Sequence, residues 1–268
     1  MSPHALFESC LAEACTGAGF YLNPYSVAQG CIANTCGTGF FGNDGSRLID
    51  CSATANTTLG FDLGSGVFLH RCTARGNGTT NAAGNANIRA GFRTHIAQCL
   101  VDAGAYRGIV TAHACIIAEN LVSTTSGIGI EAGDGCTIER NNVSNNTGNG
   151  VQIANSCRVH ANIIDYHPTA GTSAIRCLGS NNSIEQNNLT RGSDRCRHDQ
   201  LDQQRHPQQP RLLHHALRRQ RRRQLVPADL RRQHRLGSHA VLQRGVLAVA
   251  WTPPGSALRA WRVDRPLQ

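Results

Sequence analysis

The stretch SGIGIEAGDGCTIERNNVSNNTGNGVQIANSCRVHANII, residues 126–164, decides the fold because it contains one short pattern twice. Cys136 is followed five residues later by Asn141, and the pair returns 21 residues further on as Cys157 and Asn162. A fixed period of roughly this length is the signature of a solenoid, in which successive coils stack on one another. The pattern, with Asn, Cys or Gly five residues after its lead residue, begins at Cys10, Cys31, Cys51, Cys72, Cys99, Cys115, Cys136, Cys157 and Asn182.

The spacing of these lead residues is regular except around Cys99. Most steps are 20 or 21 residues and the last is 25, but the steps before and after Cys99 are 27 and 16. Since 27 and 16 together make two ordinary steps, we expect all nine lead residues to form one continuous column. The stretch GNGTTNAAGNAN, residues 76–87, is then a loop inserted at a corner of one coil.

Each repeat also contains three short segments with the two-residue alternation of a β-strand. One follows the lead residue and places Ile138 and Val159 inward, and another follows the asparagine and places Val143 inward. The third is a small residue followed by an apolar one, and a helical 3.6-residue stripe is found nowhere in this part of the chain. The sequence therefore predicts an all-β, parallel β-helix solenoid of about nine coils over residues 1–194. The small–apolar pairs are Gly19-Phe20, Gly39-Phe40, Gly60-Phe61, Gly91-Phe92, Gly108-Ile109, Gly127-Ile128, Gly150-Val151 and Ala174-Ile175.

The repeated Cys and Asn are interpreted as structural. A sharp corner often needs a left-handed backbone, which Asn and Gly tolerate, and stacked Asn amides can bond to one another. Cysteine is a small, soft hydrophobe suited to a narrow interior position, so we expect a buried, reduced ladder of thiols. Disulfides are the first alternative, but they are typical of short secreted chains with weak cores. Metal is the second, but the C-x4-C spacing is not that of a zinc site. We expect no metal site and no cofactor.

Residues 195–268 have a different composition from the rest of the chain. The chain has no lysine; residues 1–194 carry a net charge of −3, whereas residues 195–268 carry +12. Arg, Gln, His, Pro and Leu, whose codons mostly begin with C, make up 48 of the 72 residues at 197–268. We interpret this tail as the product of a shifted reading frame. The alternatives are a disordered basic arm, which would bind nucleic acid, and a small folded module; we consider nucleic acid an improbable partner.

The ends of the chain give a limited prediction of location. The segment LFESC, residues 6–10, already leads into a corner, so we expect the solenoid to be cut in mid-coil at its N-terminus. A basic region followed by an apolar one, as in a signal peptide, is not found at Met1. The apolar segment VLQRGVLAVAW, residues 241–251, is too short to span a bilayer.

The stretch quoted above and NNSIEQNNLT, residues 181–190, resemble right-handed parallel β-helix repeat proteins, the broad pectate-lyase-like superfamily, and within it an uncharacterised bacterial branch. The resemblance covers about residues 5–195. It implies the fold and an exported or envelope location. It does not decide activity, because members include polysaccharide lyases and hydrolases, periplasmic NosD-type proteins and surface adhesins.

One outward face provides the candidate site. The residue after each small–apolar pair should point outward and form a column: Tyr21, Phe41, Asp62, Arg93, Val110, Gly129, Gln152 and Arg176. Aromatic and polar side chains together suit sugar rings, so Tyr21, Phe41, Gln152 and Arg176 are our candidates for binding carbohydrate. Asp62 and Arg93 should lie one coil apart; they are weak catalytic candidates, and the alternative is a surface ion pair.

Three functions remain open from the sequence. The first is a non-catalytic β-helix scaffold or carbohydrate-binding surface, with polysaccharide as its partner. The second is a fragment of a polysaccharide lyase or glycoside hydrolase, although the acidic clusters of those enzymes are not found in the sequence. The third is nucleic-acid binding through the Arg-rich tail. The sequence decides neither whether the protein is an enzyme nor its oligomeric state.

Overall fold

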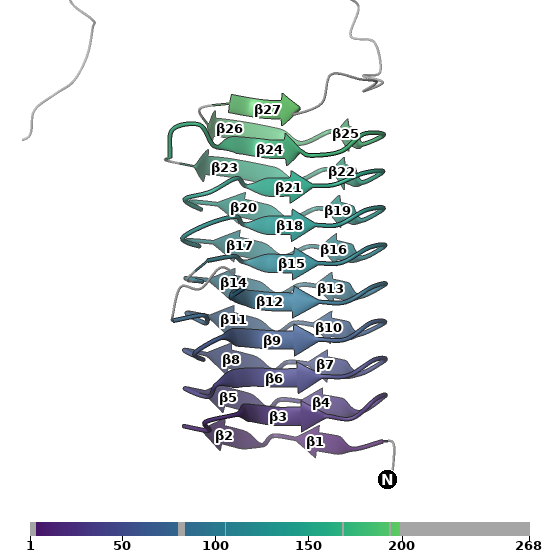
Figure 1. Ribbon diagram of the computed structural model, residues 1–268, viewed down its shortest axis with the longest axis vertical. Helices are drawn as coiled ribbons and strands as arrows, with labels where there is room; N and C mark the ends of the chain where they lie inside the picture. The colour runs from purple at the N-terminus through teal and green to yellow at the C-terminus, as the bar shows by residue number, and fades with distance from the viewer. Residues whose placement is uncertain (1–3, 80–83, 105, 168, 193, 199–268) are drawn as a thin grey trace, which may run out of the picture. The chain divides into compact units, whose positions relative to one another are not determined.

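Three parallel β-sheets of nine strands each form the computed structural model, which describes residues 4–79, 84–104, 106–167, 169–192 and 194–198 (Figure 1). Each coil contributes one strand to sheet A, one to sheet B and one to sheet C, and each strand pairs in parallel with its counterparts in the neighbouring coils. Within the described residues there is no helix that could cross a bilayer. The predicted parallel β-helix is confirmed.

The strands are short, mostly of three or five residues. Sheet A contains β1 (Leu6–Glu8), β4 (Val27–Gln29), β7 (Arg47–Ile49), β10 (Phe68–His70), β13 (His95–Ala97), β16 (Ile116–Ala118), β19 (Thr137–Glu139), β22 (Arg158–His160) and β25 (Ser183–Glu185). Sheet B contains β2 (Leu11–Glu13), β5 (Ile32–Asn34), β8 (Ser52–Thr54), β11 (Thr73–Arg75), β14 (Leu100–Asp102), β17 (Leu121–Ser123), β20 (Asn142–Ser144), β23 (Ile163–His167) and β26 (Asn188–Gly192). Sheet C contains β3 (Ala18–Leu22), β6 (Thr38–Gly42), β9 (Leu59–Leu63), β12 (Ala86–Ala90), β15 (Ile109–Thr111), β18 (Ile130–Ala132), β21 (Val151–Ile153), β24 (Ser173–Cys177) and β27 (Asp194–His198).

Each corner after a strand of sheet A, and each corner after a strand of sheet B from β2 to β20, begins with one residue in the left-handed conformation. Ala55 (φ 54°) follows β8 and Arg140 (φ 53°) follows β19, and each precedes a corner asparagine, Asn56 or Asn141. The expectation that the asparagines themselves adopt the left-handed backbone is therefore wrong. A left-handed non-glycine residue is strained, and here its amide is hydrogen-bonded to the next coil, as Arg140 N–H is to the carbonyl oxygen of His160 at 3.2 Å.

The corner asparagines form the predicted ladder, with amides bonded in both directions along the solenoid. Asn141 Nδ2 donates to the carbonyl oxygen of Ile117 at 2.9 Å and to Asn162 Oδ1 at 3.0 Å. Its own Oδ1 accepts the backbone N–H of Asn120 at 2.9 Å. The side chain is only 1% exposed. Each such amide satisfies a corner N–H that water cannot reach, which explains why this polar side chain lies in the interior.

Cysteine occupies the same kind of position and makes weaker versions of the same contacts. Cys136 Sγ donates to the carbonyl oxygen of Ala112 at 3.2 Å and accepts the backbone N–H of Cys115 at 3.4 Å. The cysteines from Cys10 to Cys177 are free, and all of these but Cys10 and Cys15 are buried. The predicted reduced ladder is confirmed, and cysteine and asparagine are exchangeable at a corner because both can donate to one coil and accept from the other.

The nine lead residues form two columns, so the expected single column is wrong. Leu100 pairs with Leu121, so Cys99, just before sheet B, lies against Asn120 of the next coil. His95 pairs with Ile116, so Cys115, just before sheet A, lies against Thr94. The 16-residue step therefore joins two different corners and does not measure a coil. The column before sheet B contains Cys10, Cys31, Cys51, Cys72, Cys99, Asn120, Asn141, Asn162 and Asn187, and the column before sheet A contains Ser26, Ser46, Val67, Thr94, Cys115, Cys136, Cys157 and Asn182.

The core changes its composition along the solenoid. In the N-terminal coils, sheet B contributes alanines such as Ala53 and sheet C contributes phenylalanines such as Phe61, both 0% exposed. In the C-terminal coils, sheet B contributes Val122 and sheet C contributes Ile130. A large side chain therefore faces a small one in the first half, and two of intermediate size face each other in the second. The same interior is filled to native density in two ways.

The last described strand crosses the predicted domain boundary. β27 pairs with β24 and includes residues 195–198, which we expected to lie outside the solenoid. Residues 199–268 lie outside the described residues, and so the interpretations of the tail stay predictions. The insertion at residues 76–87 lies between β11 and β12 as expected, but its last two residues already belong to β12.

Candidate functional site

An exposed aromatic pair begins the outward column of sheet C. Tyr21 on β3 pairs in register with Phe41 on β6, and their rings stack with centroids 4.9 Å apart and planes 12° from parallel. Tyr21 is 59% exposed. Behind them, Phe20, Phe40 and Phe61 form a second stack inside the solenoid. The backbone register of the sheet thus holds a flat aromatic surface outside and supports it from within.

The next two residues of this column form an ion pair, and one of them was predicted wrongly. Asp62 on β9 pairs with Arg89 on β12. Arg89 binds it through two bonds, Nε to Oδ1 at 2.9 Å and Nη2 to Oδ2 at 2.7 Å. Asp62 raises the pKa of Arg89. Arg93, the predicted partner, lies three residues beyond the end of β12 in the turn towards sheet A, because Phe92 is half exposed and does not enter the core.

A second carboxylate of this column, Glu131, was missed by the sequence analysis. Gly127-Ile128 was taken as the inward pair of this coil, but the inward residue is Ile130, so the outward position belongs to Glu131 and not to Gly129. Glu131 lies 2.7 Å from Arg107 Nε and accepts a hydrogen bond from Gln152 Nε2 at 3.4 Å. Gln152 and Arg176, two of the predicted residues, follow it in register on β21 and β24.

Arg93 belongs instead to a shallow hollow over the turns between sheets C and A. The hollow has a volume of about 440 Å³, and Phe92 and His113 line it with Arg93. The rings of Phe92 and His113 stack at 5.4 Å. The structure thus separates Arg93 from Asp62. On neighbouring strands it places Tyr21 beside Phe41, Phe41 beside Asp62, and Gln152 beside Arg176.

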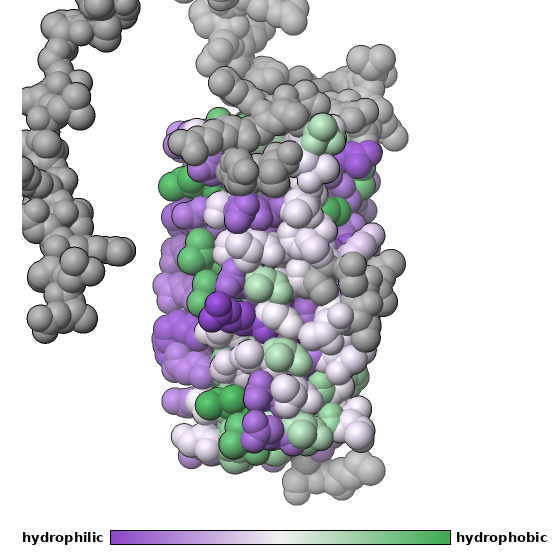
Figure 2. Space-filling model, turned by 90° about the vertical axis from the view of Figure 1, so that its left-hand side faces the viewer, coloured by the Kyte–Doolittle hydropathy of each residue, from purple (hydrophilic) through white to green (hydrophobic). Residues whose placement is uncertain are grey.

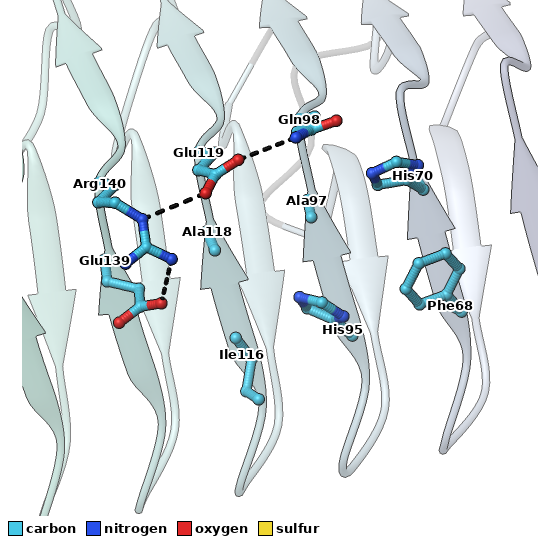
Figure 3. Close-up of a pocket in the computed structure, with 10 residues that line it drawn as sticks. All are labelled: Phe68, His70, His95, Ala97, Gln98, Ile116, Ala118, Glu119, Glu139 and Arg140. Carbon is cyan, nitrogen blue, oxygen red and sulfur yellow. Dashed lines mark hydrogen bonds and ion pairs between the residues drawn. The ribbon is translucent and has the colours of Figure 1, made fainter.

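A second hollow, of about 370 Å³, lies on the outer face of sheet A (Figure 3). We call it the sheet A hollow; Glu119 lies on its rim, with Gln98 Nε2 donating to Oε2 at 2.9 Å and Arg140 Nε to Oε1 at 3.2 Å. These two bonds lower the pKa of Glu119. Burial and the nearby His70 lower the pKa of His95. The sheet A hollow is lined by Phe68, His70, His95, Ala97, Gln98, Ile116, Ala118, Glu119, Glu139 and Arg140.

The buried thiols of Cys31, Cys51 and Cys72 are structural rather than reactive. Burial raises the pKa of Cys31 and of Cys72, and the hydrogen bond to Cys72, together with burial, raises that of Cys51. These groups stay protonated at neutral pH, whereas a metal ligand or nucleophile would be the thiolate. Over the described residues, no group of three or more His, Cys, Asp or Glu side chains could hold a metal ion.

The outer surface mixes polar and apolar residues. Figure 2 shows the side of the solenoid where strands of sheet B end and strands of sheet C begin; on this face the hydrophobic residues lie in small groups among hydrophilic ones. Single exposed apolar residues of this kind are ordinary on a protein surface. The stacked aromatic pair and the two hollows are therefore the features with the geometry of a site.

Comparisons with known proteins identify a family and several structures of similar fold. The family model described as "Periplasmic copper-binding protein (NosD)" matches residues 65–206. The A-modules of the Azotobacter vinelandii mannuronan C-5 epimerases AlgE4 and AlgE6 match at 13% and 15% identity, each with a TM-score of 0.45. The match to AlgE4 covers 71% of this chain and 64% of the AlgE4 chain, and the match to AlgE6 covers 68% of this chain and 61% of the AlgE6 chain. The Dettilon tailspike protein matches at 16% identity and a TM-score of 0.47 over 71% of this chain and 54% of its own. A search of curated proteins finds no match.

Proposed function

This chain belongs to the NosD family of right-handed β-helix proteins, and we propose that it is a non-catalytic β-helix surface that binds polysaccharide on the outer face of sheet C. The observation that carries the proposal is the stack of the exposed Tyr21 on the half-buried Phe41. Sugar rings have apolar faces that pack on aromatic rings, and hydroxyls that bond at the edges. Tyr21 supplies a flat apolar surface with a hydroxyl at one end.

Of the two predicted polar residues in the same column, the half-buried Arg176 extends this surface along the solenoid. Gln152, on the strand before it, is only 8% exposed, and Asn149 Nδ2 donates to its Oε1 at 3.0 Å. Strands of neighbouring coils are about 4.8 Å apart, so a column of side chains presents contacts at intervals that suit a chain of linked sugars. Binding by many weak contacts along a chain requires no deep pocket.

The carboxylates of this face support binding over hydrolysis. Asp62 and Glu131 are three strand spacings apart, about 14 Å, whereas the paired carboxylates of glycosidases lie roughly 5–10 Å apart. Each is also ion-paired, to Arg89 or to Arg107. The alternative, a lyase or hydrolase fragment, would need a second free carboxylate near one of them. Nucleic-acid binding through the tail concerns residues outside the described part of the chain.

The family's description names copper and the periplasm. The donor set of the described residues does not fit copper, because three ligands do not converge anywhere in it and the thiols whose pKa is raised are protonated. We therefore derive no copper-dependent role for these residues. The word periplasmic agrees with an exported or envelope location, which we include in the proposal.

Binding to a panel of soluble polysaccharides and their oligosaccharides, measured by calorimetry, tests the proposal. Tyr21→Ala and Phe41→Ala should each weaken binding about two- to tenfold, because a stacked aromatic contact contributes about 0.5–1.5 kcal/mol. Phe92→Ala, which removes an exposed aromatic ring elsewhere, is the matched control and should change nothing. The proposal is wrong if no polysaccharide binds, or if Tyr21→Ala and Phe41→Ala bind as well as the unmodified protein.

A further inference from the structure

The sheet A hollow exists because two successive coils place alanine at an outward position. Ala97 on β13 pairs with Ala118 on β16, and the larger residues His70 and Glu139 occupy the same column on either side. Although they face outward, Ala97 and Ala118 are only 6% and 5% exposed, because the side chains around them cover them. Two short side chains leave a depression about 10 Å long, the length of two strand spacings.

One wall of the depression is aromatic and apolar. Phe68, His95 and Ile116 form the neighbouring outward column. The rings of Phe68 and His95 meet edge to face, with centroids 5.3 Å apart. Figure 3 shows these side chains on the side of the depression opposite Gln98 and Glu119. A flat ligand that enters it would contact chiefly this wall, because the alanines beneath are almost completely covered.

The other side is a row of alternating hydrogen-bond donors and acceptors. Gln98 and Arg140 donate to the two oxygens of Glu119, and Arg140 Nη2 also donates to Glu139 Oε1 at 2.6 Å. Figure 3 shows the four side chains linked in this way along the rim. Adjacent hydroxyls of a sugar each donate and accept, and so can bridge a carboxylate and the guanidinium or amide beside it.

We propose that the sheet A hollow binds one neutral pyranose unit of a glycan. Its aromatic and apolar wall would face the sugar ring, and its rim would bind vicinal hydroxyls. A uronate is disfavoured, because the rim has two carboxylates and its one guanidinium is already bound to both. The volume, about 370 Å³, is at the small end of the range for ligand pockets and suits a single ring. This site is on a different sheet from the aromatic pair and does not depend on it.

Saturation-transfer NMR with methyl glycosides of glucose, galactose and mannose, and with galacturonate, tests this proposal. At least one neutral glycoside should receive saturation and shift the imidazole signals of His70 and His95. Ala118→Leu fills the depression and should weaken binding at least about tenfold. Ala97→Leu provides an independent second variant. Gln29→Leu adds the same side chain at the same column position four coils away, where it is exposed, and should bind normally, as should Tyr21→Ala.

Three outcomes would overturn the proposal. One is the failure of all three neutral glycosides to bind. Another is an equal loss of binding in Ala118→Leu and Gln29→Leu, which would place the sugar elsewhere. The last is binding of galacturonate in preference to the neutral sugars. If binding is lost in Tyr21→Ala but kept in Ala118→Leu, the sheet C surface is supported and the sheet A hollow is rejected.

Discussion

In the N-terminal coils, cysteines such as Cys51 occupy the corner before sheet B, whereas in the C-terminal coils that corner belongs to asparagines such as Asn141. The cysteines reappear in the C-terminal coils one corner earlier, before sheet A. The change falls at Cys99, whose backbone N–H donates to Asn120 Oδ1 at 2.9 Å. One thiol column thus ends on an amide column without a break in hydrogen bonding.

This difference shows that a corner requires a side chain that makes two hydrogen bonds, rather than one particular residue type. The side chain must accept a backbone N–H from the preceding coil and donate to a carbonyl oxygen that lies 24 residues before it in most coils. Asn141 does this with two strong bonds and Cys136 with two weaker ones. The core shows the same tolerance, since Phe with Ala and Ile with Val fill equivalent coils.

The largest effect should follow from emptying the core of an N-terminal coil. Phe61→Ala should lower the free energy of unfolding by about 3–5 kcal/mol. Phe61→Ile, which introduces the residue type of the C-terminal coils, should cost less, and adding Ala53→Val in the same coil should restore part of that loss. Urea unfolding measures all three. If the double variant is no more stable than Phe61→Ile, the two halves do not fill equivalent volumes.

A smaller effect is expected when the amide ladder is interrupted. Asn141→Ala leaves a buried N–H and a buried carbonyl oxygen without partners, which should cost about 3 kcal/mol. Asn141→Cys introduces the residue type of the thiol columns, and its loss of unfolding free energy should be clearly smaller than that of Asn141→Ala. Asn142→Ala, which removes an exposed asparagine next to it, is the control and should stay within roughly 0.5 kcal/mol. Equal losses for the alanine and cysteine variants at residue 141 would contradict the equivalence of the two corner residues.

The thiol columns predict a loss of stability in alkali. The folded-state pKa of Cys51 and Cys72 is raised above that of an unfolded thiol, about 8.5. The folded state therefore keeps protons that the unfolded chain loses, and stability is constant below this pH and falls above it, by up to about 1.4 kcal/mol per thiol per pH unit. Urea midpoints between neutral pH and moderately alkaline pH measure the slope. Cys51→Ala should reduce the slope; an unchanged slope would show that the thiol does not contribute.

The smallest effect concerns the point where the outer face of sheet C changes from aromatic to polar. The pair of Asp62 with Arg89 is partly exposed, and its coupling energy in a double-mutant cycle should be about 0–1 kcal/mol. Asp62→Asn, Arg89→Gln and their combination measure it. The same cycle with Arg93→Gln should show no coupling. Coupling of Asp62 to Arg93 in place of Arg89 would contradict the strand register in this coil.

The sequence was sufficient to predict the fold, but not to decide which corner of its coil each lead cysteine occupies. The 21-residue period and the Cys and Asn columns were found because both kinds of corner repeat at the same interval. A corner residue, a three-residue strand, one left-handed residue and the next corner fit the Cys-x4-Asn spacing equally well before sheet A and before sheet B. Nothing in that spacing distinguishes Cys99 from Cys115, and the two columns were merged for this reason.

Because of the same ambiguity, the sequence analysis assigned the wrong residues to two outward positions of the candidate site. A signal was present: the inward residue of sheet C precedes the next corner by six residues in Ile109–Cys115, and Ile88–Thr94 and Ile130–Cys136 share that spacing. Gly91-Phe92 and Gly127-Ile128 do not, so Arg89 and Glu131 could have been found. The sheet A hollow could not, because it depends on which alanines of different coils become neighbours.

The positions of the sulfur atoms test the central claim most directly, namely that equivalent corners stack in register and that the lead cysteines move from the corner before sheet B to the corner before sheet A after Cys99. Anomalous scattering from sulfur in a crystal would locate them without reference to the chain trace. The account predicts two separate rows with neighbours about 4.8 Å apart. One contains Cys31, Cys51, Cys72 and Cys99, and the other contains Cys115, Cys136 and Cys157. A single row through all seven sulfurs, or sulfurs that form no rows, would contradict it.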